Sequence, residues 1–211
     1  MKKIALSLSL ICGLASFVGA ANAYEGNAEA GKAKAASCGA CHGPDGNSAM
    51  TTYPKIAGQH AQYIYSQLAA FKQGMQSGGK EGRYDPVMSA MAMPLTDDDM
   101  KDLAAHFSGQ KMKPGSTPEE VVAAGKKLYI AGDAERGIPG CTACHGPRGT
   151  GMGPAGFPQI SFQHADYTKA SLEKFRNGTR ANDKNNIMTD IAKKLTDKDI
   201  EILSKYLGGL H

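Results

Sequence analysis

Apolar side chains recur along the chain at the spacing of a helical face, and no segment alternates apolar and polar residues as a half-buried strand would. In the segment 60–73, Ile64, Leu68 and Phe71 occupy positions i, i+4 and i+7. The segment 164–177 repeats this pattern. We therefore expect an all-α protein with a central helix in each half of the chain.

Capping signals predict where further helices begin and end. Thr96 and Thr196 each precede an apolar-periodic segment, and each is followed three residues later by an aspartate, Asp99 or Asp199. This spacing is typical of a helix start, because both side chains bond to backbone N–H groups that the first turn leaves free. The central helices are expected to end at glycines, namely Gly74 and Gly178.

Each half is also expected to open with a helix. The first should cover 28–37. The second should begin after Thr117 as the capping residue, with Pro118 in the first helical position, where its missing N–H does no harm. Val121 and Leu128 then lie on one apolar face of this second helix.

The two halves of the chain look like copies of one domain. Matching blocks occur in the same order, with offsets of 94 to 104 residues, far longer than a solenoid repeat. These blocks are 30–32 with 124–126, 38–43 with 141–146, 53–56 with 157–160, 59–63 with 163–167, and Leu68, Phe71 and Gly74 with Leu172, Phe175 and Gly178. The stretch 108–116 has the composition of a linker. We expect an N-terminal domain at 24–112 and a C-terminal domain at 113–211.

The first residues have the pattern of a secretory signal peptide. Lys2 and Lys3 supply positive charge, 4–20 is almost wholly apolar, and Ala21-Asn22-Ala23 is a cleavage site of the A-x-A type. We expect residues 1–23 to be cleaved and the mature protein to be exported to the periplasm. An uncleaved membrane anchor is the alternative, and the short apolar run disfavours it.

The charge of the mature chain argues against nucleic acid as a partner. The full sequence has 24 basic and 20 acidic residues, and cleavage removes Lys2 and Lys3, so the net charge falls from +4 to +2. No second long apolar run follows the first. We therefore expect a monomer that is soluble or only peripherally associated with a membrane.

The run Cys-x-x-Cys-His occurs twice, at Cys38–His42 and Cys141–His145. On a helix, residues i, i+3 and i+4 share one face, so two thiols and one imidazole point the same way. This is the attachment pattern of a c-type haem, in which the histidine of each run ligates the iron. Paired cysteines also form zinc half-sites and thioredoxin-like redox pairs, but neither needs an adjacent histidine in two copies. The sequence therefore predicts two covalently bound haem c groups, held by Cys38, Cys41, Cys141 and Cys144, with His42 and His145 as iron ligands.

The residue opposite each histidine decides the chemistry of the iron. A methionine thioether closes the iron and raises its reduction potential, whereas an open position would bind peroxide, oxygen or carbon monoxide. Met88 and Met188 are equivalent in the internal alignment, because each lies seven residues before the leucine that precedes a last-helix cap. We predict these two as the sixth ligands. Met91 or Met93 could replace Met88, although each aligns with a residue that cannot ligate.

Two further repeated residues bear on the iron sites. His60 and His164 match each other, which leaves a bis-histidine alternative beside a polar role at the start of each central helix. Pro54 and Pro158 also match, and their carbonyl groups could accept a hydrogen bond from the iron-binding histidines and so orient them.

The chain resembles the cytochrome c4 family, which comprises periplasmic dihaem cytochromes built from two class I cytochrome c domains. The matching segments are C-x-x-C-H-G-x-x-G at 38–46 and 141–149, Pro-Lys-Ile-Ala-Gly-Gln-His at 54–60, its looser copy at 158–164, and a methionine before each last helix. The resemblance implies domains related by a pseudo-twofold axis, haems that face each other across the interface, and His/Met ligation of both irons. One departure is Phe162, where the first half has Gly58, and it leaves the local loop shape open.

The family resemblance also implies a function. Such a protein would carry single electrons between a membrane quinol-oxidising complex and a terminal oxidase or reductase, without turning over a substrate. One alternative is a dihaem electron-transfer subunit of a catalytic complex, which would use the same site residues. The other is a peroxidase-type enzyme, which needs an open iron and is disfavoured by equivalent methionines in both halves.

Overall fold

The computed structural model describes residues 26–211, and over this range the protein is helical. The predicted signal peptide at 1–23 lies outside the described residues. Between residues 26 and 211 the only extended pairings are two isolated bridges, Asp133 with Ile138 and Met152 with Phe157. The expectation of an all-α protein is confirmed for this part of the chain.

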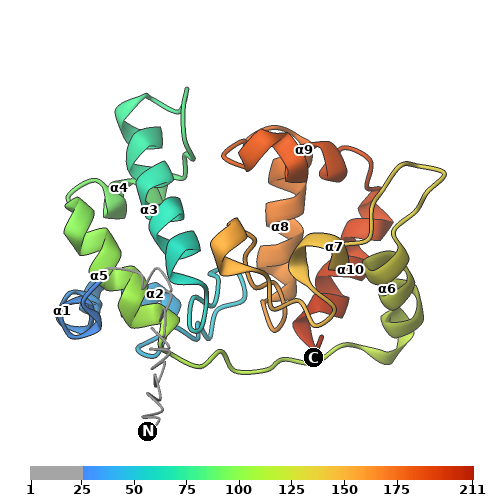
Figure 1. Ribbon diagram of the computed structural model, residues 1–211, viewed down its shortest axis with the longest axis horizontal. Helices are drawn as coiled ribbons and strands as arrows, with labels where there is room; N and C mark the ends of the chain where they lie inside the picture. Colours follow the sequence, from blue (N-terminus) through green and yellow to red (C-terminus); the bar gives the residue numbers. More distant parts are fainter. Residues whose placement is uncertain (1–25) are drawn as a thin grey trace, which may run out of the picture.

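The N-terminal half forms one side of the molecule in Figure 1. Its helices are α1 (Ala28–Lys34), α2 (Ala36–His42), α3 (Ala61–Gln76), α4 (Pro86–Ala92) and α5 (Asp97–Ser108). The chain then crosses to the other side through residues 109–118, which run along one edge of the molecule without helical structure (Figure 1).

The C-terminal half repeats the same order of helices. They are α6 (Glu119–Ala131), α7 (Thr142–His145), α8 (Ala165–Arg176), α9 (Ile187–Ala192) and α10 (Asp197–Gly208), with two short 3-10 segments, η1 (Gly153–Ala155) and η2 (Lys184–Asn186). Among the residues between 26 and 211, no helix is both long enough and apolar enough to cross a bilayer.

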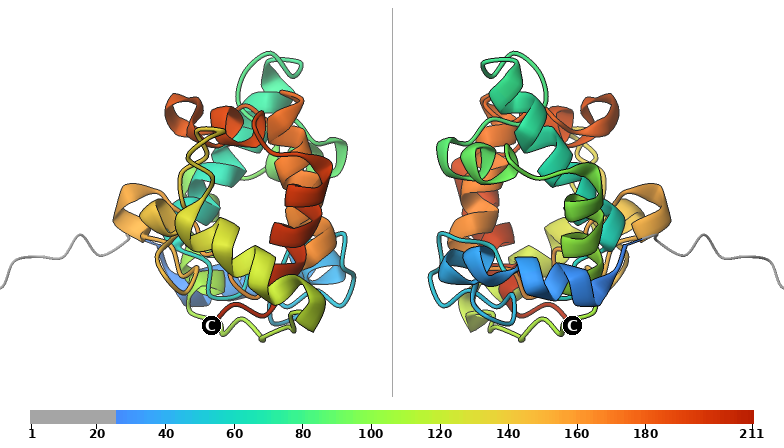
Figure 2. Two further views of the ribbon diagram at one scale, coloured as in Figure 1. Left: turned by 90° about the vertical axis from the view of Figure 1, so that its right-hand side faces the viewer. Right: turned by 90° about the vertical axis from the view of Figure 1, so that its left-hand side faces the viewer.

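Equivalent helices make equivalent contacts in the two halves. Helix α1 packs on α5, and α3 packs on both α5 and α4; in the other half α6 packs on α10, and α8 packs on α10 and α9. The end-on views of Figure 2 show the first helix of each half crossing its last helix. The duplication expected from the matching blocks is therefore a duplication of tertiary structure.

A glycine allows each of these first-to-last helix crossings. A Cβ atom on Gly31 would lie 2.0 Å from the backbone oxygen of Asp102, and one on Gly125 would lie 2.5 Å from the side chain of Tyr206. Both distances are far below van der Waals contact. The helices approach this closely only because both positions lack a side chain.

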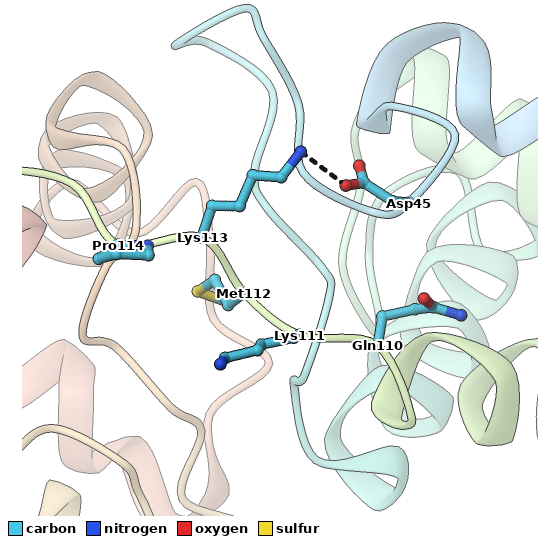
Figure 3. Close-up of a pocket in the computed structure, with 6 residues that line it drawn as sticks. All are labelled: Asp45, Gln110, Lys111, Met112, Lys113 and Pro114. Carbon is cyan, nitrogen blue, oxygen red and sulfur yellow. Dashed lines mark ion pairs between the residues drawn. The ribbon is translucent and has the colours of Figure 1, made fainter.

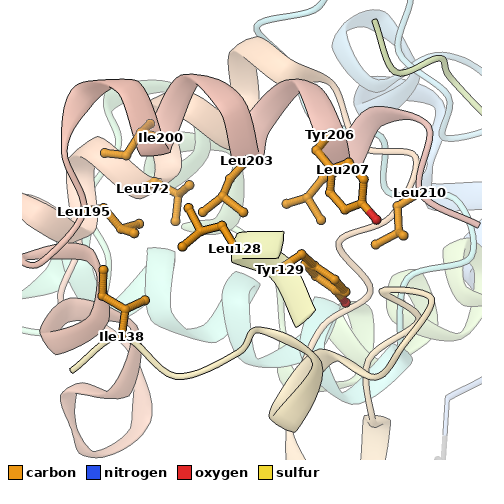
Figure 4. Close-up of a cluster of buried hydrophobic side chains, with 10 residues drawn as sticks. All are labelled: Leu128, Tyr129, Ile138, Leu172, Leu195, Ile200, Leu203, Tyr206, Leu207 and Leu210. Atoms are coloured by element: carbon orange, nitrogen blue, oxygen red, sulfur yellow. The ribbon is translucent and has the colours of Figure 1, made fainter. Parts of the chain in front are cut away.

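Each half buries its own hydrophobic cluster beneath these crossings. The N-terminal cluster contains Ile64, Leu103, Ala104 and Phe107. The C-terminal cluster, drawn in Figure 4, contains Leu128, Tyr129, Ile138, Leu172, Leu195, Ile200, Leu203, Tyr206, Leu207 and Leu210. Ile64, Leu128 and Leu172 are among the apolar positions whose helical spacing the sequence shows.

Both opening helices differ from the prediction. The segment 28–37 is not one helix, because α1 ends at Lys34 and a new helix, α2, starts at Ala36 and carries the first cysteine pair. Thr117 does not cap α6, which begins at Glu119 after Pro118. The Thr117 hydroxyl instead donates to the Tyr206 carbonyl at 2.8 Å and accepts from the Gly209 N–H at 3.1 Å. A tertiary contact has taken the place of the local cap.

The two central helices also end differently. Gly178 follows the capping residue Asn177 with φ at 81°, as a helix-ending glycine should. Gly74 lies inside α3, which continues to Gln76, so the predicted stop there is wrong. A Cβ on Gly74 would lie 2.2 Å from the Arg83 carbonyl oxygen, so this glycine serves to let the following loop pack against the helix.

The predicted starts of the last helices are confirmed. Thr96 accepts a hydrogen bond from the Asp99 N–H at 3.1 Å while the Asp99 carboxylate accepts from the Thr96 N–H at 2.9 Å. Thr196 and Asp199 form the same reciprocal pair, with the same distances. The four-residue pattern Thr-x-x-Asp thus predicts the start of both last helices.

The linker is tied to the N-terminal half by polar contacts. The Lys113 N–H donates to the Asn47 side chain at 2.7 Å, and the Lys113 ammonium pairs with Asp45 at 2.8 Å. Figure 3 shows this ion pair beside a surface pocket lined by Asp45, Gln110, Lys111, Met112, Lys113 and Pro114. Met112, a residue of the linker itself, is buried. The segment between the halves is thus held against the protein rather than free.

Candidate haem-binding sites

Both cysteine pairs lie on the short second helix of their half. Helix α2 carries Cys38 and Cys41, and α7 carries Cys144 with Cys141 as its capping residue. All four thiols are free and partly buried. Burial raises the pKa of the Cys38 thiol, and it raises that of Cys141 to about 11. These two cysteines pack against the hydrophobic clusters of their halves. Each pair therefore stands at the edge of an apolar interior.

The histidine of each pair is buried and oriented by a backbone carbonyl. His42 and His145 are each 6% exposed. The Nδ1 atom of His42 lies 2.9 Å from the Pro54 oxygen, and Nδ1 of His145 lies 2.9 Å from the Pro158 oxygen. A carbonyl accepts only, so Nδ1 carries the proton and the Nε2 lone pair is left for a metal. The predicted role of the two prolines is confirmed.

Burial also keeps these imidazoles neutral. It lowers the pKa of both His42 and His145, although the bond to the proline carbonyl acts in the opposite direction. A neutral imidazole with Nδ1 protonated is the form that ligates iron through Nε2. Nε2 of neither histidine forms a hydrogen bond with another residue in the range 26–211.

The predicted methionines lie on equivalent helices, and both are half-buried. Met88 is on α4, where its N–H donates to the capping carboxylate of Asp85 at 3.1 Å. Met188 is on α9 and packs against the C-terminal hydrophobic cluster. The alternatives Met91 and Met93 are 40% and 41% exposed. Of the three candidates in the N-terminal half, Met88 is therefore the least exposed.

His60 and His164 bond to the opposite half of the molecule. Nε2 of His60 lies 2.8 Å from the Thr150 oxygen, and Nε2 of His164 lies 2.9 Å from the Ser48 oxygen. Each residue also precedes a central helix, as expected. The ring nitrogens are engaged across the interface, which counts against the bis-histidine alternative. Their matching positions in the repeat were a signal of a symmetric interface, which sequence reasoning missed.

Two glutamines make the interface reciprocal. The Gln59 side chain accepts from the Gln159 N–H at 2.9 Å and donates to the Gln159 oxygen at 2.8 Å. The Gln163 side chain does the same to the backbone of Lys55, at 2.9 and 2.8 Å. Because Gln59 matches Gln163 and Lys55 matches Gln159, the exchange of bonds is that of two halves related by a pseudo-twofold axis.

The departure at Phe162 leaves the loop unchanged. Gly58 has φ at 68° and Phe162 has φ at 64°. The N–H of Gly58 donates to the Phe107 oxygen at 2.9 Å, and that of Phe162 donates to the Leu207 oxygen at the same distance. A phenylalanine at positive φ is strained by roughly 1–3 kcal/mol. The interface glutamine that follows is placed alike in both halves, which explains why the strained backbone is kept.

The donor set of each half fits a covalently bound haem. Each half supplies two thiols one helical turn apart and a buried imidazole with a free Nε2. Each also supplies a half-buried methionine on a separate helix. A zinc site would need three or four gathered ligands, and no three His, Cys, Asp or Glu side chains gather in this way between residues 26 and 211.

Comparison with known proteins agrees with this geometry. The family model described as cytochrome c matches residues 28–110 and again 122–211. The chain is 45% identical over 214 residues to cytochrome c4 of Stutzerimonas stutzeri, covering 100% of both chains. The chain belongs to the cytochrome c4 family. It is accordingly a dihaem electron carrier and not an enzyme, with two covalently bound haem c groups.

Further relatives agree with this fold, and one of them is named as an electron acceptor. The crystal structure of reduced recombinant cytochrome c4 from Pseudomonas stutzeri superposes with a TM-score of 0.86 at 46% identity, covering 88% of this chain and 100% of that chain. Two tandem cytochrome c domains are therefore the architecture of this member too. A thiosulfate dehydrogenase electron acceptor of Stutzerimonas stutzeri is 34% identical over 83% of this chain and 80% of its own.

Proposed function

We propose that this protein carries single electrons in the periplasm, from a quinol-oxidising complex to a terminal oxidase or reductase. The observation that carries the proposal is the equivalence of the two halves: each has a buried, carbonyl-oriented histidine and a half-buried methionine on a matching helix. Two closed irons suit electron transfer and leave no position for a substrate. The signal-peptide pattern at residues 1–23 supports export to the periplasm.

The proposal gives each site residue a role. Cys38 and Cys41 hold one porphyrin by thioether bonds, and Cys141 and Cys144 hold the other. The iron ligands are His42 and Met88 in the N-terminal half and His145 and Met188 in the C-terminal half. When bound, each haem supplies an iron that cycles between ferric and ferrous.

The protein's own residues keep that cycle free of ligand exchange. The Pro54 and Pro158 carbonyls hold the two imidazoles in one orientation and one tautomer. The caps of α4 and the packing of α9 fix the helices that carry the methionines. Ligands that stay bound in both oxidation states keep the reorganisation that accompanies electron transfer small.

We further propose that the N-terminal domain spans 24–112 and the C-terminal domain 113–211. Lys113, at the proposed boundary, lies in the linker and contacts Asp45 and Asn47 of the N-terminal domain. A monomer with at most peripheral membrane association is the form in which such a carrier would shuttle between two partners.

The first test is an absorption and electron paramagnetic resonance spectrum of the purified mature protein, followed by carbon monoxide added to the reduced form. Two low-spin haems with a methionine–iron charge-transfer band, and no carbon monoxide binding, are expected. A high-spin or carbon-monoxide-binding haem would mean that one iron is open, and the carrier assignment would have to be abandoned.

A second candidate is a dihaem electron-transfer subunit that stays bound to a catalytic partner. The relative named as a thiosulfate dehydrogenase electron acceptor favours it. All site residues are shared with the first candidate, so the test is purification of the tagged protein from its own periplasm. A partner in fixed stoichiometry would support the subunit, whereas a protein that elutes alone and is reduced by a quinol-oxidising complex would support the free carrier.

A further inference from the structure

Two arginines lie where the halves meet, Arg180 buried and Arg83 half-buried. Arg83 follows α3, and Arg180 follows α8, in the connections that lead to the methionine helices α4 and α9. Arg180 is 5% exposed. The guanidinium of Arg83 lies 4.5 Å from the centroid of the Phe71 ring, and that of Arg180 lies 4.3 Å from the Phe175 ring. Each arginine thus packs on the matching phenylalanine of its own half.

Each arginine also reaches into the other half. Arg180 donates to the Tyr63 hydroxyl at 2.8 Å, and Arg83 approaches the Tyr167 hydroxyl at 3.4 Å. Tyr63 and Tyr167 match each other in the repeat. Both arginines donate in addition to one oxygen, Oε1 of Gln67, at 2.9 Å from Arg83 and 3.2 Å from Arg180. Two like charges therefore converge on a single neutral acceptor.

No carboxylate compensates these charges. The ion pairs of the described residues involve other side chains, and neither Arg83 nor Arg180 pairs with an Asp or Glu. Burial alone would raise the pKa of Tyr167, yet Arg83 and Arg180 outweigh it and lower this pKa to about 7. Burying a charge without an opposite charge is strongly unfavourable. Arg83 and Arg180 would consequently be stabilised by an anion whose oxygen atoms accept their hydrogen bonds.

We propose that Arg83 and Arg180 form one carboxylate-binding site across the interface, filled by propionate groups of the two haems, so that each arginine influences both redox centres. This rests on the proposed function, because each half is assigned a covalently held haem and a haem carries two carboxylates. Guanidinium groups bind carboxylates well because their N–H groups form a planar fork. Gln67, Tyr63 and Tyr167 position the two forks.

Each arginine should influence both haems because its hydrogen bonds reach into the other half. Arg180 belongs to the C-terminal half, but its hydrogen bonds to Tyr63 and Gln67 place its charge against α3 of the N-terminal half. A buried positive charge destabilises the ferric state relative to the ferrous state and so raises a reduction potential. Loss of either arginine should therefore lower both potentials, whereas an arginine serving only its own haem would lower one.

The test compares Arg180→Gln and Arg83→Gln with Arg176→Gln in the holoprotein. Arg176 lies in the C-terminal half, as Arg180 does, and pairs with Asp197 at the surface. It is therefore a control for the loss of one positive charge. The readouts are the two midpoint potentials and the propionate bending modes in the resonance Raman spectrum. Each interface variant should shift both potentials downwards and move a propionate band, while Arg176→Gln should leave the band in place.

Two further variants separate the effect of the arginine's charge from that of its hydrogen bonds. Arg180→Lys retains the charge and should restore much of the potential but not the propionate band, and Tyr63→Phe should give a smaller change in the same direction. If wild-type potentials instead follow the acetate concentration at constant ionic strength, the site holds a mobile anion and the propionate assignment is wrong. Variants with intact His/Met spectra but unchanged Raman bands and potentials would overturn the proposal. Loss of the His/Met spectrum from the wild type would instead overturn the proposed ligands.

Discussion

In the N-terminal half the methionine helix starts from a capped turn, whereas in the C-terminal half it starts from two left-handed residues. The Asp85 carboxylate caps α4 by accepting from the Met88 N–H. Helix α9 follows Asn185 and Asn186, both at φ 56°, and the Asp183 carboxylate accepts from the Thr189 N–H instead. Asparagine tolerates this backbone better than most residues. Two different local solutions thus present a methionine at the same place.

The exposed faces of these two helices also differ. Val87 and Met91 are exposed on α4, and no charged residue occurs between 86 and 96. The corresponding stretch of the C-terminal half contains Asp190, Lys193 and Lys194, all exposed. Equal ligand sets in unequal surroundings should have unequal potentials, because charge and solvent near a haem tune its potential. The ligands are thus the same in both halves, whereas the helix start and the exposed charges around each methionine differ.

Removal of a sixth ligand should produce the largest difference between the two haems. Met88→Ala and Met188→Ala should each open one iron, so that one of the two haems becomes high-spin, binds carbon monoxide and shows a lower potential. Spectra of each variant with carbon monoxide measure this. The matched controls are Met91→Ala and Met93→Ala, which should leave both haems low-spin. Unchanged spectra in Met88→Ala would show that another residue ligates the N-terminal iron.

Overpacking the helix crossings should distinguish the two halves by stability. In Gly31→Ala the new methyl group meets backbone, which cannot move aside, while in Gly125→Ala it meets the Tyr206 side chain. We expect losses of about 1–3 kcal/mol in the free energy of unfolding, with the larger loss for Gly31→Ala. Denaturant titration measures both, and Gly109→Ala is a control whose nearest contact is 3.6 Å. Equal losses would mean that Tyr206 is as rigid as backbone.

The reciprocal glutamines should differ in the free energy that they contribute. Gln163→Ala leaves the buried N–H and carbonyl of Lys55 unpaired, and Gln59→Ala does the same to the less buried Gln159. An unsatisfied buried group costs about 1–3 kcal/mol, so we expect Gln163→Ala to be the more destabilising. Chemical denaturation tests this, with the exposed Gln62→Ala as control. The opposite order would contradict the burial argument.

Loss of the helix caps should have smaller and similar effects. Thr96→Ala and Thr196→Ala should each lower the free energy of unfolding by about 1 kcal/mol, because each removes an acceptor for a backbone N–H. Thermal unfolding of both variants beside the exposed Thr52→Ala measures the difference. A cap whose removal changes nothing would show that its helix start is held by packing alone.

The smallest expected effect is a pH dependence of the C-terminal cap. Burial would raise the pKa of the Asp199 carboxyl, but bonds from Arg136 and Thr196 hold it at about 2. A lowered pKa means that the stabilisation is complete above about pH 4 and is lost as the pH falls towards 2. Asp199→Asn should therefore flatten the fall in unfolding free energy over this range. Asp98→Asn, at an exposed position, is the control for the loss of one carboxylate.

The sequence by itself determined the features that depend on neighbours in the chain. The Cys-x-x-Cys-His runs, the Thr96 and Thr196 capping boxes and the internal repeat all follow from short-range spacing. The proline carbonyls that orient His42 and His145 were also predictable, because the same loop occurs twice. Such features have a local physical cause, namely which backbone groups a helix or turn leaves free.

Only the tertiary structure decided what depends on partners far along the chain. The sequence places His60 at a helix start and Gln59 only in a repeated block, yet both bond to the other half, some 90 to 100 residues away. Gly74 was read as a helix stop, yet it makes room for the Arg83 loop. The convergence of Arg83 and Arg180 on Gln67 has no local signature at all. Long-range contacts are selected by the docking of whole halves, which no local pattern of residues specifies.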